Sequence, residues 1–184
     1  SYDGSTDEAE VVGKIFADQG VDPSKVSGDI EMVAYLQGYG DTTTDEINAA
    51  IQAAPDAFIS VGMATTFFTQ QLNAAGIEFS DIDSFTKSNG EAITSGKLVY
   101  LAGKYSSSVG PAFALIMNAI NGNIVRDADG NAVSISQNYQ VATDEATFDE
   151  FYKTDNGDNP IYNKETLDKI IGDSVTCDDI TKLV

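Results

Sequence analysis

The chain has 184 residues, with 10 Lys and Arg against 29 Asp and Glu, and its formal net charge is −19. So acidic a protein repels nucleic-acid phosphates and anionic membranes, which excludes a nucleic-acid partner. The chain contains no His, so Ser-His-Asp and Cys-His catalysis and His-ligated zinc are excluded. Its single Cys, Cys177, cannot form an internal disulfide or a thiolate metal cluster. We therefore expect a non-enzymatic domain without metal or cofactor.

The first hundred residues alternate between helical and strand patterns. Cap residues, helical spacing of apolar residues and Gly or Pro stops predict four helices: 7–19, a helix from the cap 41–44 to Pro55, 64–75, and a short one over 89–95. Short apolar runs predict four strands: 30–36, 57–61, 82–85 and 98–102. Since the strands are apolar runs rather than strict alternations, we expect a parallel sheet buried on both sides.

The pattern changes after Gly103. An apolar helix is predicted over 109–120, capped by Ser106, Ser107 and Ser108, and a strand follows within 133–141. The polar tail carries two modest helices, 145–152 and 164–171. The fold class that results is α/β, a three-layer Rossmann-like lobe with a mostly parallel sheet over 1–142 and a helical C-terminal extension over 143–184.

Ligands of such sheets bind at the carboxyl ends of the strands. The loops after the four predicted strands therefore supply the candidate site. The candidate ligand-binding residues in these loops are Tyr39, Gly62, Met63, Phe85, Thr86, Lys104 and Tyr105. Tyr39 and Tyr105 suit stacking on a sugar ring, although half-buried packing explains them equally well.

Three stretches in this order resemble the C-terminal lobe of type I periplasmic, or extracellular, solute-binding proteins, the sugar-binding group of ABC transporters. The stretch 55–64 with the helix ending at Gly76 resembles the family's strand, ligand loop and helix. The stretch 90–98 is similar to the segment before its crossover strand, and 103–122 to its crossover loop and last long helix. Gly62 and Met63 stand where the family usually has an Asn-Asp pair, and the Asp usual at the end of the next strand is not found near Phe85.

The resemblance implies the substrate-binding component of an ABC importer, which traps a carbohydrate-like solute between two lobes and then docks on a membrane permease. It implies an extracellular protein anchored at the cell surface, or a periplasmic one. It also implies a companion N-terminal lobe that we expect to lie outside this chain. The apolar helix 107–121 would pack on that lobe, so on its own it would fold back or mediate self-association. Lys104 stands where the family often has Gln, which favours an anionic solute.

Four alternatives stay open. The same fold serves as the effector-sensing domain of sugar-responsive transcription regulators, and paired carboxylates can also hydrolyse glycosides. The run 127–131 has the oxygen-rich look of a calcium loop, but position 138, where a bidentate Glu would stand, is Asn, which favours a plain turn. The hydroxyls of 106–108 either bind an anion or only cap the following helix.

Overall fold

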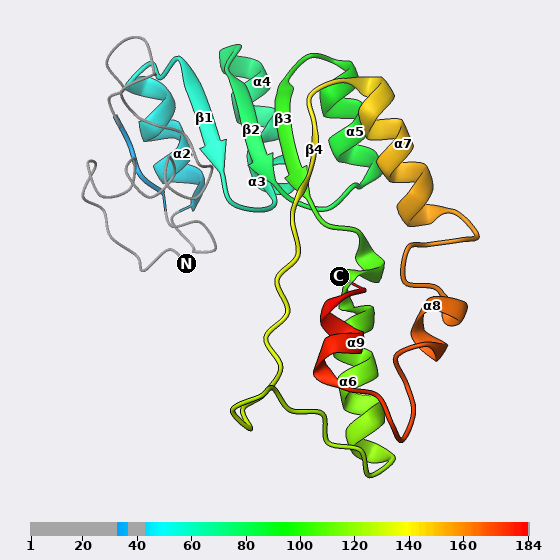
Figure 1. The fold of residues 1–184 in the computed structure, drawn as a ribbon. Helices are drawn as coiled ribbons and strands as arrows, with labels where there is room; N and C mark the ends of the chain where they lie inside the picture. The colour runs from blue at the N-terminus through cyan, green and yellow to red at the C-terminus, as the bar shows by residue number, and fades with distance from the viewer. Residues whose placement is uncertain (1–32, 37–42, 184) are drawn as a thin grey trace, which may run out of the picture. The chain divides into compact units, whose positions relative to one another are not determined.

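A computed structural model of the chain describes residues 33–36 and 43–183 (Figure 1). The chain divides into two compact units, 1–56 and 57–184. In the first unit the predicted helix after 41–44 is confirmed as α2 (Thr43–Gln52), which buries Ile47 and Ala50. The predicted helix 7–19 and the candidate residue Tyr39 lie outside the described residues. Residues 33–36 form no strand, so the strand predicted over 30–36 is wrong over its described part.

The second unit is built on a four-stranded sheet. Its strands β1 (Ala57–Ser60), β2 (Glu78–Ile82), β3 (Leu98–Gly103) and β4 (Gln140–Ala142) follow one another in the order β1-β2-β3-β4. The first three strands are parallel, and β4 pairs with β3 in the antiparallel sense. The predicted α/β class with a mostly parallel open sheet is therefore confirmed.

The position of β2 differs from the prediction, which placed this strand over 82–85. The strand lies four residues upstream, because Phe79 supplies its core side chain and is completely buried. Its Asp81 is also buried, with backbone amides as hydrogen-bond partners. A search for apolar runs misses this strand, because it contains the polar residues Glu78, Ser80 and Asp81.

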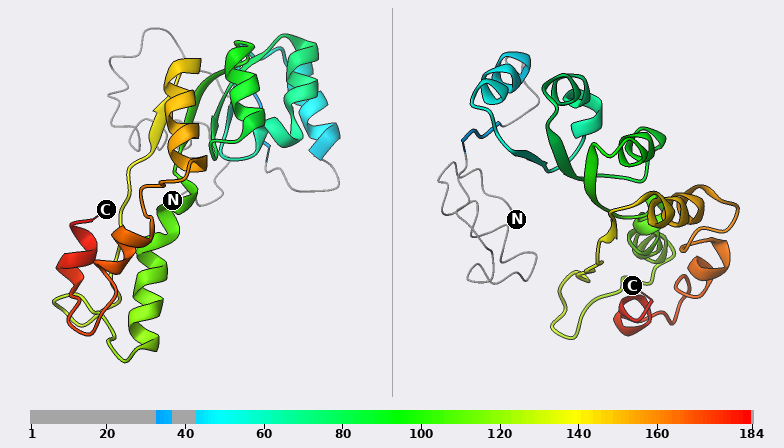
Figure 2. Two further views of the ribbon diagram at one scale, coloured as in Figure 1. Left: turned by 90° about the vertical axis from the view of Figure 1, so that its right-hand side faces the viewer. Right: turned by 90° about the horizontal axis from the view of Figure 1, so that it is seen from above.

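Helices cover one face of this sheet. These are α3 (Ala64–Phe67), α4 (Thr69–Ala75), α5 (Lys87–Thr94) and α7 (Glu145–Asn156), and Figure 2 shows them in one layer beside the strands. The single helix predicted over 64–75 is thus interrupted at Phe68.

The break at Phe68 has a packing cause. Phe68 has a φ of −123°, outside the helical range, and its ring packs edge-on against Phe58 of β1 with centroids 5.4 Å apart. Since Phe58 turns toward the helices, the next residue, Ile59, turns to the opposite face, where it is 63% exposed. Burial on both sides is therefore not found at Ile59. The helices α3, α4, α5 and α7 lie together on the other face of the sheet (Figure 2).

A second cluster of helices lies beyond the carboxyl ends of the parallel strands (Figure 1). The chain leaves β3 through the 3₁₀ helix η2 (Ser106–Val109) into α6 (Gly110–Ile120), and α8 (Lys164–Asp168) and α9 (Cys177–Thr181) pack beside α6. The core of this cluster is formed by Ala114, Ile170 and Ile180. The predicted extension 143–184 therefore has two roles, since α7 joins the helix layer of the sheet while α8 and α9 cover α6.

Two asparagines hold the tail on α6. The buried side chain of Asn118 donates to the carbonyl of Ile170 (2.8 Å) and accepts from the amide of Gly172 (2.8 Å). Asn123 donates to the carbonyls of Gly172 and Val175. One face of α6 is thus covered by the C-terminal tail of the same chain, and the expectation that this helix folds back or self-associates stays a prediction.

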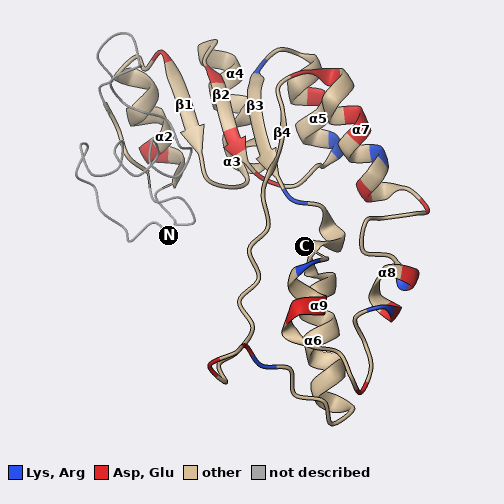
Figure 3. Cartoon of the chain, in the orientation of Figure 1, with Lys and Arg blue, Asp and Glu red and all other residues tan. Residues whose placement is uncertain are grey.

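The other face of α6 is apolar and exposed. Phe113, Ile116 and Ile120 follow one another at helical spacing, and Ile116 and Ile120 are 60% and 71% exposed. The helix carries no charged residue, so it appears without red or blue in Figure 3. We call these three side chains the α6 stripe.

Candidate functional site

The loop between β1 and α3 is held in an unusual shape. Gly62 has a φ of 102° and Met63 a φ of 63°, both in the left-handed region. The side chain of Met63 stays 37% exposed at the carboxyl edge of the sheet. Beneath the loop, Asp81 accepts hydrogen bonds from the amides of Gly62 (3.0 Å) and Ala64 (2.8 Å).

The loop between β2 and α5 contains a carboxylate that the sequence analysis missed. Because β2 ends at Ile82, the half-exposed Asp83 directly follows this strand. One of its oxygens accepts from the amide of Ser84 (2.7 Å). The shift of β2 was the reason for missing it, since a strand over 82–85 would have placed Asp83 inside the sheet.

Thr86 and Phe85 face different surroundings in this loop. The Thr86 hydroxyl caps α5 by accepting from the amide of Asn89 (3.2 Å) and contacts the hydroxyl of Ser88. Phe85 is only 2% exposed. Its ring packs against Tyr105, Phe148 and Phe151, with centroids 5.7, 6.2 and 5.2 Å away.

Tyr105 belongs to the same aromatic cluster. Its ring also meets Phe151 edge-on, with centroids 6.1 Å apart. Burial, and after it the charges of Glu150 and Asp155, raise the pKa of Tyr105 above its usual value. Phe85 and Tyr105 are therefore brought together, but as packing partners of each other rather than as two free ring faces.

Lys104 lies where the chain crosses from the sheet to α6. Its ammonium group sits over the ring of Tyr139, 5.2 Å from the centroid. Tyr139 immediately precedes β4, and Gly103 pairs with Gln140. The contact thus joins the outgoing and returning segments between the sheet and the α6 cluster, and it holds the cation near the edge of the sheet.

Of the hydroxyls before α6, that of Ser106 is bound by the chain itself, whereas that of Ser107 is buried without a hydrogen-bond partner. Asp155, near the end of α7, accepts from the amide of Ser106 (2.6 Å) and from its hydroxyl (2.9 Å). This carboxylate contacts η2 across 49 residues of sequence. The predicted capping of the apolar helix by the hydroxyls of 106–108 is wrong, because neither η2 nor α6 begins with a side-chain cap, and the contact to Ser106 comes from α7 instead.

The turn interpretation of 127–131 is also confirmed. Asp127 accepts from the amides of Asp129 (3.0 Å) and Asn131 (2.7 Å), and Gly130 has a φ of 82°. Across residues 33–36 and 43–183, the structure contains no group of three or more acidic or Cys side chains arranged to hold a metal ion. No helix in these ranges is long and apolar enough to cross a membrane.

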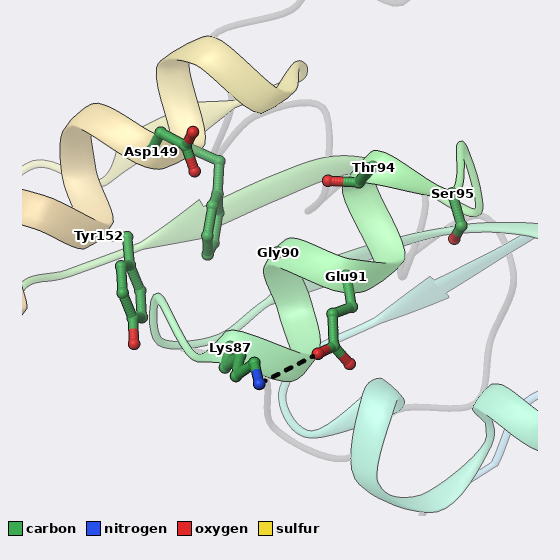
Figure 4. Close-up of a pocket in the computed structure, with 8 residues that line it drawn as sticks. Lys87, Gly90, Glu91, Thr94, Ser95, Asp149 and Tyr152 are labelled. Carbon is green, nitrogen blue, oxygen red and sulfur yellow. Dashed lines mark ion pairs between the residues drawn. The ribbon is translucent and has the colours of Figure 1, made fainter.

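A groove between α5 and α7 lies apart from the candidate residues (Figure 4). Lys87 and Glu91 form an ion pair on one side of it, and Asp149 and Tyr152 of α7 lie on the other. The two helices approach closely at Gly90, where a Cβ would overlap the ring of Phe148. This groove therefore lies between helices of the covering layer, and none of the candidate ligand-binding residues lines it.

Of the seven candidate residues, six lie within the described ranges, and they follow the carboxyl ends of β1, β2 and β3. Because these three strands are adjacent and parallel, the loops meet along one edge of the sheet. Met63, Thr86 and Lys104 have exposed or half-buried side chains there, whereas Phe85 is buried. Comparison of the chain with protein-family models, with curated proteins and with solved structures gave no match.

Proposed function

We propose that this chain contributes one lobe of a two-lobed solute-binding protein that serves an ABC-type importer and binds a carbohydrate-like solute. The lobe performs no bond chemistry. It supplies one wall of a cleft, and closure of the two lobes buries the solute before the protein docks on a membrane permease. Such a protein works outside the cytoplasmic membrane, in the periplasm or anchored at the cell surface.

The observation that carries the proposal is the composition of the open edge. Met63, Asp83, Thr86 and Lys104 follow three adjacent parallel strands. They combine an apolar side chain, a carboxylate, a hydroxyl and a cation. Carbohydrates present hydroxyl groups together with apolar ring faces, and binding sites for small molecules mix apolar side chains with a few polar groups in the same way.

The α6 stripe is an argument for a second lobe. The stripe belongs to α6, which lies beyond the carboxyl ends of the parallel strands (Figure 1), and exposed apolar patches of this kind mark surfaces that meet another protein. A companion lobe seated on the stripe would lie beside α6, beyond the carboxyl ends of β1, β2 and β3. The solute would then lie between that lobe and the loops described above.

Binding of sugars to the 184-residue chain tests the proposal. A panel of neutral and acidic monosaccharides is titrated at millimolar concentration and followed by ligand-observed NMR, because half a cleft buries little of the solute and binds weakly. We expect at least one sugar to bind, and Asp83→Ala to weaken that binding about tenfold, the loss of one charged hydrogen bond. Asp149→Ala on α7 is the matched control and should bind like the unaltered chain. No binding by any sugar of the panel would overturn the proposal.

The charge of the solute is tested separately at Lys104. If the cation selects an anionic solute, Lys104→Ala should weaken binding of an acidic sugar about tenfold more than binding of its neutral counterpart. Lys97→Ala, before β3 at the opposite end of the strand, should change neither affinity. Equal losses for both sugars would show that Lys104 only holds Tyr139.

A further inference from the structure

Both carboxylate oxygens of Asp81 bind the same short loop. The side chain is 1% exposed, and its Oδ1 and Oδ2 accept from the amides of Gly62 and Ala64. Between these two amides stands Met63, with its φ of 63°. The hydroxyl of Ser60 adds a bond to the carbonyl of Gly62 (3.1 Å). A single buried residue of β2 therefore binds the β1–α3 loop at the residues before and after Met63.

The left-handed backbone conformation of Met63 requires hydrogen bonds that hold the loop in place. A residue with a Cβ is disfavoured in the left-handed region, and it stays there only where its surroundings fix it. The two bonds to Asp81 supply this constraint from the side of the sheet, while the Met63 side chain points to the exposed edge. Without them, the amides of Gly62 and Ala64 would lose their acceptors, and the two peptide groups that adjoin Met63 would be held only through their carbonyls, by Ser60 and by the amides of Thr66 and Phe67.

Burial of the Asp81 carboxylate is energetically unfavourable. Loss of water around the carboxylate is the largest influence on its pKa and raises it, against the opposing effect of the bonds from Ala64 and Gly62 and of the neighbouring hydroxyl of Ser60. Asp83 raises it further as a neighbouring negative charge. Among the packed elements, β1, α3 and β3 carry no charged residue, and the Tyr100 side chain of β3 lies at the register of Ser80, on the opposite face. On α5, Lys87 and Glu91 are exposed and paired with each other.

We propose that Asp81 is a positioning residue that sets the shape of the loop 61–64 and thereby fixes where Met63 is presented at the edge of the sheet. It acts from beneath the loop and does not touch the solute. Its effect on the loop is independent of the proposed function, whereas its effect on solute binding rests on that function.

Amide hydrogen exchange in Asp81→Asn tests the effect on the loop. A carboxamide oxygen can accept from one of the two amides, but its NH₂ group then faces the other N–H. We expect the amides of Gly62 and Ala64 to exchange at least tenfold faster, with the amide of Leu101 in β3 unchanged. Asp149→Asn is the control with the same chemical change on an exposed helix. Unchanged exchange at both loop amides would overturn the proposal.

A second variant tests the link to Met63. Adding Met63→Gly to Asp81→Asn removes the penalty of the left-handed conformation, so part of the lost protection at Ala64 should return. A purely structural role of Asp81 within β2 would not be rescued by a change in the loop. No recovery at Ala64 would therefore reject the link to strain at Met63.

The unaltered chain supplies a measurement that does not depend on folding of a variant. In an NMR pH titration, the amide proton shifts of Gly62 and Ala64 should move with the same midpoint as the Asp81 carboxyl carbon. Different midpoints would overturn the proposal even if Asp81→Asn does not fold.

The effect on solute binding is read separately. For a sugar that binds the unaltered chain, Asp81→Asn should weaken affinity at least tenfold. If no sugar binds the unaltered chain, the proposed function fails, while the exchange and titration results still decide the effect on the loop. If exchange becomes faster and affinity stays the same, the loop 61–64 is no part of the binding site.

Discussion

A buried carboxylate in the middle of a strand, such as Asp81, shows how much the meaning of a residue depends on its partners. In the sequence it interrupts an apolar run, and this concealed the strand. In the structure its two oxygens satisfy two backbone amides of a neighbouring loop. Burial of a charged group is tolerated where its hydrogen bonds are made, so such a residue marks a place where geometry is maintained at the expense of stability.

The pH dependence of stability follows from the direction of this pKa shift. Because burial raises the pKa of Asp81 in the folded chain, its contribution to stability is complete below the pKa of the unfolded chain, about 3.9, and is lost as pH rises through the folded value. The free energy of unfolding of the unaltered chain, minus that of Asp81→Asn, should therefore fall as pH rises from acid toward neutral. Urea unfolding across this range measures the difference. An increase with pH would mean that the hydrogen bonds outweigh burial.

Gly103 is required by a close approach of two backbones. A Cβ at this position would overlap the carbonyl oxygen of Asp83, and the ring of Phe85 lies just beyond it. Gly103→Ala should therefore lower the free energy of unfolding by about 1–3 kcal/mol, as overpacking of a tight interior does. Gly172→Ala is the control, because the atom nearest to its Cβ would be 3.9 Å away. Equal unfolding midpoints for the two variants in urea would contradict the close approach.

At the scale of elements, the sequence patterns predicted most helices and strands of the second unit, but not all of their boundaries. The strand β3 and the helices α5 and α7 lie close to their predicted positions, since each combines cap residues or an apolar run with a clear stop. The break at Phe68 and the position of β2 depend on contacts between residues far apart in the chain. Local patterns contain no information about such contacts.

The same limit applies to the candidate site. The rule that ligands bind at strand ends depends only on the order of strands and helices, and the three loops that it selects do lie along one edge of the sheet. It could not show that Phe85 turns inward to Phe148 and Phe151, which come from a helix over 60 residues later. The acceptor role of Asp81 was missed for the same reason.

The attachment of the C-terminal tail to α6 depends on Asn118. Its carboxamide serves two backbone groups of the tail, at Ile170 and Gly172, and the side chain is completely buried. Asn118→Leu leaves both groups without a partner and should cost about 2–6 kcal/mol, at about 1–3 kcal/mol for each group.

Limited proteolysis offers a local measurement of this attachment. In Asn118→Leu, cleavage within 168–184 should become faster, while the segment 57–103 keeps its protection. Asn121→Leu, at an exposed position after α6, is the matched control. Equal cleavage rates in the two variants would show that the apolar core of the tail holds it without the asparagine.

For the whole molecule, the net charge opposes self-association, whereas the exposed apolar surface favours it. The net charge of −19 keeps copies of the chain apart, whereas the α6 stripe offers a surface without charge on which they can meet. An isolated lobe in which the stripe is free should therefore self-associate weakly, and more strongly at higher salt, because salt screens the repulsion.

Sedimentation velocity measures this balance. We expect a concentration-dependent increase in the sedimentation coefficient at about 0.5 M salt that is smaller at about 0.02 M, where the Debye length is several times longer. Ile116→Lys should abolish the increase, and Lys164→Ala on the exposed surface of α8 should leave it unchanged. A chain that stays monomeric under all these conditions would contradict self-association through α6.

The connection between the sheet and α6 has a mechanical consequence. The outgoing segment at Lys104 and the returning segment at Tyr139 run side by side and are fastened by their cation–π contact. Two chain segments joined side by side bend more easily out of their common plane than they slide along each other. A neutral side chain at position 104 would remove this contact, and the two segments would then be joined there by the pairing of Gly103 with Gln140.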